Sequence, residues 1–336
     1  MKMSDPSNSS DQARIQRKRR LTHELERFTL VAVWLLIAGG FSVALPGSFF
    51  TANNFAVLFS SQAPAVLLAL ALIIPLTAGD YDLSVGATVT LASMIIGVLN
   101  VWHSIPIGYV LFAAIGAGVF VGAVNAFFII YVRIPSLVVT LGTASLISGI
   151  VQWMSNSSTI SGISPWLVDA VITWQLFGVS FAFFYGLVAA CILWYVLEYT
   201  PAGRRLLFVG RGREVARLNG VNVGLTRAAA LVASSVLATL AGIVYAGLLG
   251  SADPVSGTSF LLPAFAAAFL GATSIVPGRF NPWGTFVAVY FLATGIDGLS
   301  MLGIPLWVTS VFNGAALILA VTLSQFARGR EESDLS

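Results

Sequence analysis

Ten long apolar runs follow one another along this chain, and they limit what it can fold into more than any other feature of the sequence. A helix needs about 20 mainly apolar residues to cross the hydrocarbon core of a bilayer. Only 9% of the 336 residues are charged, whereas a soluble domain carries about a quarter. We therefore predict an all-α integral membrane protein with about ten transmembrane helices. The predicted spans are residues 28–45, 55–77, 83–101, 107–131, 135–154, 180–197, 227–249, 259–276, 283–302 and 306–326.

The basic residues indicate how these spans are oriented. Lys and Arg concentrate in the cytoplasmic loops of membrane proteins. With ten spans and a cytoplasmic N-terminus, all 17 of them fall on the inner side. Both termini are therefore predicted to be cytoplasmic. The expected organisation is a basic N-terminal tail at 1–27, one transmembrane domain at 28–326 with a cytoplasmic loop at 198–226, and a C-terminal tail at 327–336.

Two pairs of segments resemble each other. "VRIPSLVVTLGTASLISG" (132–149) resembles "LGIPLWVTSVFNGAALIL" (302–319), and "TAGDYDLSVGAT" (77–88) has a weaker counterpart in "LGSADPVSGTSF" (249–260). In each pair the two members begin on opposite sides of the membrane. This indicates an inverted-topology repeat of spans 2–5 and 7–10, an arrangement that many transporters use to alternate access to a central path. The alternative is chance similarity between apolar segments.

Asp80 and Asp82 lie at the predicted inner end of the second span. An aspartate at the bilayer centre costs about 2.5–3.5 kcal/mol, but this position is close to the interface. Either carboxylate can cap the first turn of the third span, where Ser84 is also available. The alternative is a direct role in gating or in contacting another subunit.

The longest predicted inner segment, 198–226, contains "REVARLNG" (213–220). This stretch predicts a short amphipathic helix with Val215 and Leu218 on one face. Such a surface can lie on the membrane interface or dock into the groove of a partner. The residues of this element are Arg213, Glu214, Val215, Ala216, Arg217, Leu218, Asn219 and Gly220.

Several kinds of site are missing from the sequence. The chain has no G-x-x-x-x-G-K-[ST] motif and only two lysines, Lys2 and Lys18, so we expect no ATP site of its own. Its single cysteine, Cys191, excludes an internal disulfide and a cysteine-based metal cluster. In the later predicted spans Asp297 is the one acidic residue. A proton relay usually needs more titratable groups within the membrane. If the protein pumps, the energy comes from another chain. We also expect no bound cofactor or metal, and the net charge of +3 does not indicate nucleic-acid binding.

Three motifs together resemble the permease subunits of ABC importers for simple sugars, of the ribose, xylose and autoinducer-2 type. "AGDYDLSVGA" is similar to that family's Gly-x-Asp-Leu-Ser-Val-Gly signature, with one extra residue between Gly79 and Asp82. "GRRLLFVGRGREVARLNGVNV" is similar to its cytoplasmic segment, which ends in Ala-x-x-x-Gly-[IV]-x-Val. "LAGIVYAGLLGSADPVSGTSFLLPAFAAAFLGATS" resembles the stretch through spans seven and eight, and the likeness covers about residues 45–325. The residues of the signature turn are Gly79, Asp80, Asp82, Ser84 and Gly86.

The resemblance implies a non-enzymatic permease subunit in the bacterial inner membrane. It would pair with a second permease chain, either an identical copy or a related one. A cytoplasmic ATP-binding subunit would hold ATP and Mg and dock on residues 213–223, which makes 198–226 the coupling loop. A periplasmic sugar-binding protein would deliver the substrate, and no nucleic acid is involved.

Few charged groups lie near the expected path, which favours a neutral monosaccharide or polyol as substrate. The candidate path residues are polar side chains of spans five and ten: Thr140, Thr143, Ser148, Gln152, Thr309, Ser310 and Asn313. Bonding between helices, or back to the helix backbone, is the alternative role for their hydroxyl groups. The alternative function is a stand-alone secondary sugar or polyol carrier, in which the 213–220 segment could be altered at little cost.

Overall fold

The computed structural model describes residues 28–305 and 307–335, with side chains over 28–305 and 307–324. The basic tail predicted at 1–27 lies outside the described residues. The helices are Phe28–Ala44, α2 (Ala52–Ser61), α3 (Ala63–Thr77), α4 (Ser84–Ile96), α5 (Ile107–Ala126), α6 (Ser136–Met154), α7 (Pro165–Val168), α8 (Phe181–Tyr199), α9 (Pro201–Arg211), α10 (Arg213–Leu218), α11 (Val223–Leu249), α12 (Gly257–Gly271), α13 (Pro282–Met301) and α14 (Trp307–Leu335). Three π-helical segments, η1 (Gly97–Trp102), η2 (Phe127–Tyr131) and η3 (Asp169–Thr173), extend α4, α5 and α7.

Long apolar helices dominate the described part of the chain, as the sequence predicts. Among the described residues, seven helices are long and apolar enough to cross a membrane, or eight if the bent pair α2–α3 is one span. The helix Phe28–Ala44 and α12 are apolar but shorter. The protein is therefore an all-α, multi-pass membrane protein.

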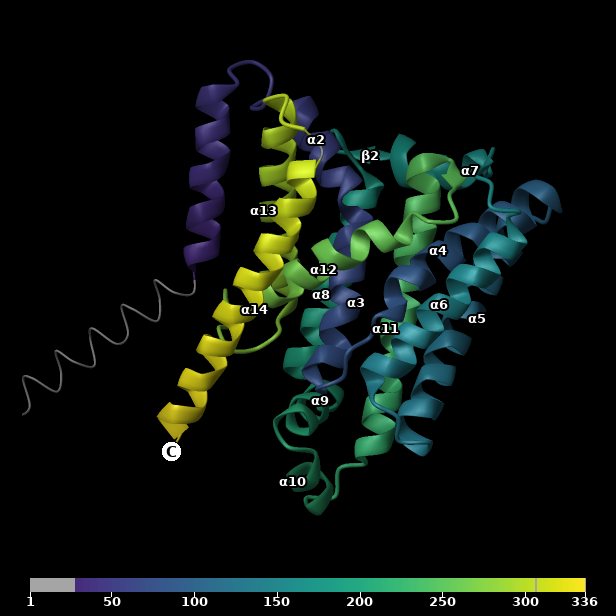
Figure 1. The fold of residues 1–336 in the computed structure, drawn as a ribbon. Helices are drawn as coiled ribbons and strands as arrows, with labels where there is room; N and C mark the ends of the chain where they lie inside the picture. Colours follow the sequence, from purple (N-terminus) through teal and green to yellow (C-terminus); the bar gives the residue numbers. More distant parts are fainter. Residues whose placement is uncertain (1–27, 306, 336) are drawn as a thin grey trace, which may run out of the picture.

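Helix α3 lies at the centre of the bundle (Figure 1). All of its residues, Ala63 to Thr77, are buried, which is the expected position for a helix that is apolar on every side. Helices α11, α12, α8 and α13 pack against it. Helix α11 also packs against α4 and α5, so α3 and α11 together form the core.

The second predicted span is broken. Helices α2 and α3 are inclined to each other by 42°. Gln62 ends α2, and Pro64 in the first turn of α3 has no N–H to continue the hydrogen bonds of the preceding helix. The span predicted over 55–77 is therefore helical but bent at Gln62.

Several helix ends differ from the sequence prediction. Helix α11 begins at Val223 rather than at residue 227, because the Asn222 side chain caps it by accepting from the N–H of Leu225. Helix α12 ends at Gly271, before the predicted residue 276, where the Asn281 side chain donates to the Gly271 carbonyl. Helix α14 continues to Leu335 through most of the predicted tail at 327–336.

The segment predicted as a cytoplasmic loop, 198–226, is largely helical. Thr200 caps α9 by accepting from the N–H of Gly203, and Pro201 occupies the first turn, which suits a residue without an N–H. Helix α10 lies where the sequence predicted a short helix. Both helices lie at the end of the molecule that holds the C-terminus, opposite α2 and α7 (Figure 1).

Two small antiparallel sheets complete the fold. Strand β1 (Ile160–Ser161) pairs with β4 (Ser251–Ala252), so that Ile160 lies opposite Ala252. Strands β2 (Gln175–Leu176) and β3 (Val179–Ser180) form a hairpin before α8. The first sheet joins the long segment after α6 to the turn before α12.

Candidate functional site

The turn between α3 and α4 holds a carboxylate that connects three parts of the chain. Asp80 accepts hydrogen bonds from Nε and Nη2 of Arg227 at 2.7 and 2.8 Å, and from Nη2 of Arg213 at 3.0 Å. Its side chain is 3% exposed. Arg213 also donates to the Gly79 carbonyl at 2.9 Å. Since Arg213 begins α10 and Arg227 lies in the second turn of α11, Asp80 joins the turn to both helices by charge-assisted hydrogen bonds.

The same turn is attached to α6 through its backbone. Ser136 Oγ accepts from the N–H of Tyr81 at 3.1 Å, and Thr140 Oγ1 accepts from the N–H of Leu83 at 3.1 Å. These N–H groups lie outside regular helix, and the two side chains of α6 supply their acceptors. The turn therefore connects α10 and α11 on one side with α6 on the other.

Asp82 organises the start of α4. Its Oδ1 accepts from the N–H and the hydroxyl of Ser84 at 3.0 and 2.6 Å. Asn125 of α5 donates to Ser84 Oγ at 2.9 Å, and the Thr143 hydroxyl of α6 donates to Asn125 Oδ1 at 2.7 Å. Asp82 thus binds the first residue of α4, although the N-cap residue of that helix is Leu83, which makes no side-chain cap bond. Asp80, which the sequence offered as an equal candidate for capping α4, pairs with arginines instead.

Only one of the two carboxylate oxygens of Asp82 takes part in these hydrogen bonds. Asp82 is fully buried, and its Oδ2 has no hydrogen-bond partner within the described residues. Burial raises the pKa of Asp82, and the hydrogen bonds from Ser84 oppose this rise. The two aspartates of the turn thus have different partners: Asp80 forms ion pairs with arginines, and Asp82 is a buried carboxyl that accepts hydrogen bonds from Ser84.

Helices α4 and α12 cross at a pair of glycines. A Cβ on Gly257 would collide with the Gly86 carbonyl oxygen and with Thr90 Oγ1. The Gly257 N–H donates to Thr90 Oγ1 at 2.9 Å. Only residues without a side chain let the two backbones approach this closely. Gly86 belongs to the signature turn and Gly257 to its predicted counterpart at 249–260, so these two segments touch.

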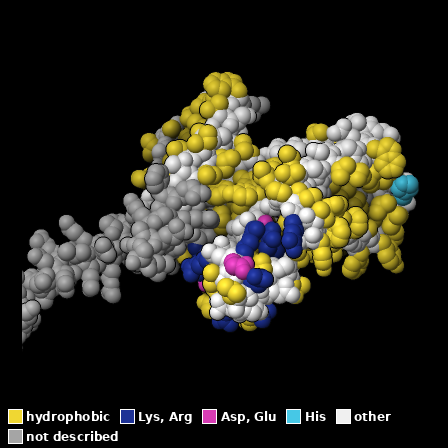
Figure 2. All heavy atoms as spheres, turned by 60° about the horizontal axis from the view of Figure 1, so that its bottom comes forward, with side chains coloured by type: hydrophobic (Ala, Val, Ile, Leu, Met, Phe, Trp, Pro, Cys, Tyr) yellow, Lys and Arg dark blue, Asp and Glu magenta, His cyan; other side chains and the backbone are white. Residues whose placement is uncertain are grey.

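Helix α10 presents an apolar surface away from the bundle. Val215 is 55% exposed and Leu218 is 76% exposed, whereas Ala216 is fully buried. Glu214 pairs with Arg217 at 2.6 Å. The helix ends with Asn219 at the C-cap and Gly220 in the left-handed region at φ +80°. Figure 2 shows basic and acidic side chains gathered on this end of the molecule, beside large hydrophobic areas.

The seven candidate path residues differ in their surroundings. Thr140 and Thr143 are committed to bonds with the turn and with Asn125. The Ser148 hydroxyl donates back to the Ala144 carbonyl at 2.9 Å. Gln152 and Ser310 are exposed, Thr309 is half-buried, and Asn313 is 8% exposed with an unpartnered Oδ1 within the described part of the chain. The path role of these residues stays a prediction.

Sequence reasoning missed several members of this site. Arg227 was counted among the basic residues, but nothing in its local pattern indicates a bond to Asp80, 147 positions earlier. Asn125 and Ser136 were not singled out either. A single asparagine near the inner end of an otherwise apolar span is the one signal that could have found Asn125. Within residues 28–305 and 307–335, no three His, Cys, Asp or Glu side chains gather in a metal-binding arrangement.

The fold is that of a multi-pass helical membrane protein, with a buried ion pair that joins the turn between α3 and α4 to the exposed helix α10. The family comparison agrees with this class. Residues 53–321 match the family model described as branched-chain amino acid transport system / permease component. Because the match spans most of the chain, the protein belongs to this family.

Three similar proteins are named as permease proteins of import or transport systems. The chain is 27% identical over 331 residues to the fructose import permease protein FrcC of Rhizobium meliloti, covering 96% of this chain and 91% of that protein. It is 32% identical over 260 residues to the autoinducer 2 import system permease protein LsrD of Photorhabdus laumondii, covering 76% and 78%. It is 26% identical over 298 residues to the D-allose transport system permease protein AlsC of Escherichia coli, covering 89% and 90%. No solved structure matches the chain.

Proposed function

We propose that this chain is the membrane-spanning permease subunit of an ATP-driven importer in a bacterial inner membrane, and that it carries a neutral monosaccharide or polyol. The family description names branched-chain amino acids, but the full-length relatives are named for fructose, allose and autoinducer 2. The charged ammonium and carboxylate groups of an amino acid would need charged partners along the path. The candidate path residues carry hydroxyl and amide groups only, which suit a polyol.

In this proposal α10 docks on a cytoplasmic ATP-binding subunit, which holds ATP and Mg. The supporting observation is the connection of an exposed apolar helix to a buried charge. Val215 and Leu218 face outward, whereas Arg213 at the start of the same helix bonds Asp80 in the turn. Displacement of α10 by a partner would therefore act on Asp80, and through Ser136 and Thr140 on α6.

The ten-span, inverted-repeat layout with both termini cytoplasmic is part of the proposal. Three turns support it. Ser104, Arg133 and Gly303 each have positive φ directly before an Ile-Pro pair. Asp253 Oδ1 accepts from the N–H of Val255 at 2.8 Å, as Asp82 Oδ1 accepts from Ser84 two residues on. The inner side is then the end with α9 and α10. A second permease chain and a periplasmic sugar-binding protein complete the transporter.

The test is co-purification of this chain with the ATP-binding subunit encoded nearest to it. Wild type is compared with Leu218→Asp, which places a charge on the exposed face of α10 without disturbing the buried Ala216. Leu302→Asp, an exposed leucine in the turn between α13 and α14, is the matched control. We expect the ATPase to be retained by wild type and by the control and to be lost with Leu218→Asp.

The opposite outcome is equally informative. If uptake of a radiolabelled sugar by vesicles containing this chain alone proceeds without ATP, and Leu218→Asp leaves that uptake unchanged, the protein is a stand-alone carrier and the docking role of α10 is wrong.

A further inference from the structure

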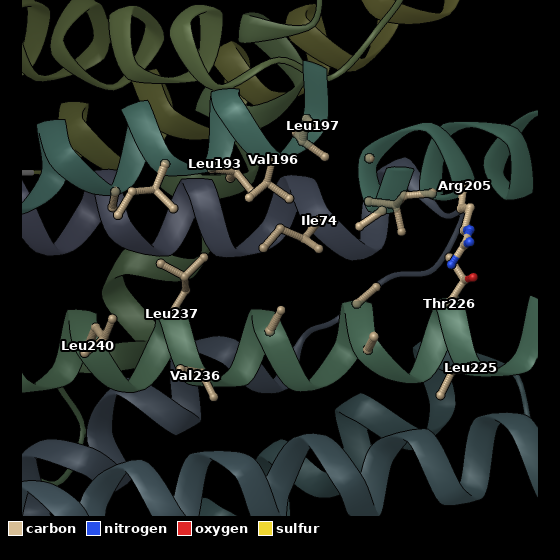
Figure 3. Close-up of a pocket in the computed structure, with 18 residues that line it drawn as sticks. Ile74, Leu193, Val196, Leu197, Arg205, Leu225, Thr226, Val236, Leu237 and Leu240 are labelled. Atoms are coloured by element: carbon tan, nitrogen blue, oxygen red, sulfur yellow. The ribbon is translucent and has the colours of Figure 1, made fainter. Parts of the chain in front are cut away.

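A long groove of about 570 Å³ runs along the outside of the bundle between α8 and α11. Ile74 of α3 forms its back, and α9 closes one end. Figure 3 shows Leu240 and Leu237 toward the other end. The groove follows α11 from Leu225 to Leu240, which corresponds to about 22 Å at the helical rise of about 1.5 Å per residue.

The polar side chains that line this groove lie at one end of it, and the rest of its lining is apolar. Arg205 of α9 and Thr226 of α11 are the only polar side chains among the described residues that line it. Both lie at the same end, where Figure 3 shows their polar atoms pointing toward one another. Arg205 has no ion pair among the described residues. Within the described part of the chain, the groove is thus apolar along its length, with the positive charge of Arg205 at one end.

We propose that this groove binds one acyl chain of an anionic phospholipid, whose phosphate is held by Arg205. A guanidinium is well suited to bind phosphate oxygens, whereas the Thr226 hydroxyl already donates to the Asn222 carbonyl at 2.9 Å. One leaflet of the hydrocarbon core is about 15 Å deep, half of about 30 Å, so the groove accommodates a whole chain. Free inorganic phosphate would leave the apolar wall uncovered, which is why the occupant is a lipid.

The lipid comes from the cytoplasmic leaflet. This follows from the orientation given under Proposed function, in which α9 lies on the inner side, but it needs neither transport nor an ATPase. The cytoplasmic leaflet is the one that carries a negative surface potential and attracts juxtamembrane arginines. The positive charge of Arg205 and the length of the groove therefore both favour an anionic phospholipid of the cytoplasmic leaflet.

The position of α9 gives the lipid a structural role. A Cβ on Gly203 would collide with the backbone of Leu197 and Val196, so α9 lies directly against the end of α8. Gly212 alone separates α9 from α10. A phosphate held by Arg205 would therefore fix the element that precedes the proposed docking helix.

The experiment measures lipid retained by the full chain. Protein purified in mild detergent is incubated with equal amounts of phosphatidylglycerol and phosphatidylcholine, repurified, and examined by native mass spectrometry. We expect one phosphatidylglycerol per chain on wild type, and at least a tenfold loss of it with Arg205→Ala. Arg204→Ala is the matched control, because it removes the neighbouring charge from a residue that does not line the groove. Ala233→Trp fills the apolar part and should also lower retention.

Four results would overturn the proposal. Equal retention of both lipids removes the role of the charge, and equal losses with Arg204→Ala and Arg205→Ala indicate a diffuse surface effect. Displacement of the lipid by excess inorganic phosphate indicates that the apolar wall contributes nothing. If Ala233→Trp leaves lipid retention unchanged and instead separates two permease chains, the groove is an interface between copies. ATPase co-purification, measured on the same samples, reports separately on the proposed function.

Discussion

Asp80 and Arg227, 147 positions apart in the chain, form a two-point ion pair in which Nε and Nη2 of the guanidinium each donate to a different carboxylate oxygen. Arg213 adds a third bond from the start of α10. The side chain of Arg227 is 14% exposed, so this pair is shielded from water and salt. It fixes the turn between α3 and α4 to the base of α11.

Replacing Asp80 should therefore be costly. Asp80→Asn leaves two guanidinium groups without a counter-charge, and breaking a buried pair from one side costs about 3–5 kcal/mol. Because Arg213 is 45% exposed and can turn toward water, we expect a value near the lower limit, measured as a loss of thermal stability in detergent.

The control for this change is Glu214→Gln, which breaks the fully exposed pair between Glu214 and Arg217. It should leave the melting temperature unchanged. A double-mutant cycle of Asp80→Asn with Arg227→Gln should show strong non-additivity. Additive losses would mean that the two residues act independently.

The close contact between α4 and α12 predicts that a single methyl group added at their crossing destabilises the protein. Gly257→Ala places a Cβ against the Gly86 carbonyl, and overpacking of this kind costs about 1–3 kcal/mol. Gly142→Ala is the matched control, because nothing lies within 4 Å of the added carbon. Melting temperatures should fall for the first variant and rise or stay for the second. An unchanged Gly257→Ala would show that the helices can separate freely.

The stability of the protein should depend on the ionisation of Asp82. Its pKa is raised above 3.8 by burial, so the folded state holds this proton more tightly than the unfolded state does. Stability then decreases as the pH rises from 3.8 through the raised pKa, because ionisation disfavours the folded state. Asp82→Asn keeps an acceptor for Ser84 and cannot ionise, so its melting temperature relative to wild type should increase with pH. Parallel pH profiles for the two proteins would refute this account.

The predicted path can be mapped with cysteine labelling, because the natural chain has only Cys191. In a Cys191→Ser background, Gln152→Cys and Ser310→Cys should react with a membrane-impermeant maleimide, and substrate should slow the reaction. Leu319→Cys is the control: it is 62% exposed, and nine residues at about 100° each place it opposite Ser310 on α14, where we expect lipid. Labelling of all three at one rate would place the path elsewhere.

Much of the helical layout could be predicted from the sequence, because apolar length and Pro or Gly breaks are local signals. The exposed face of α10 followed from the spacing of Val215 and Leu218 in the same way. The pairing of Asp80 with Arg227 could not be predicted, since it depends on how distant helices pack. Helix α9 was missed because its arginines looked like a solvated loop, whereas Leu206 and Val209 are buried against the bundle.

The central position of α3 has a consequence for how the protein is made. Helices α8, α11, α12 and α13, which surround α3, are all synthesised after it. During translation the ribosome must therefore release the future centre of the bundle into the bilayer with its whole circumference facing lipid. Its uninterrupted apolar surface is thus needed for insertion as well as for the finished fold. A polar substitution there would act first on yield during biogenesis, before any mature protein exists to be destabilised.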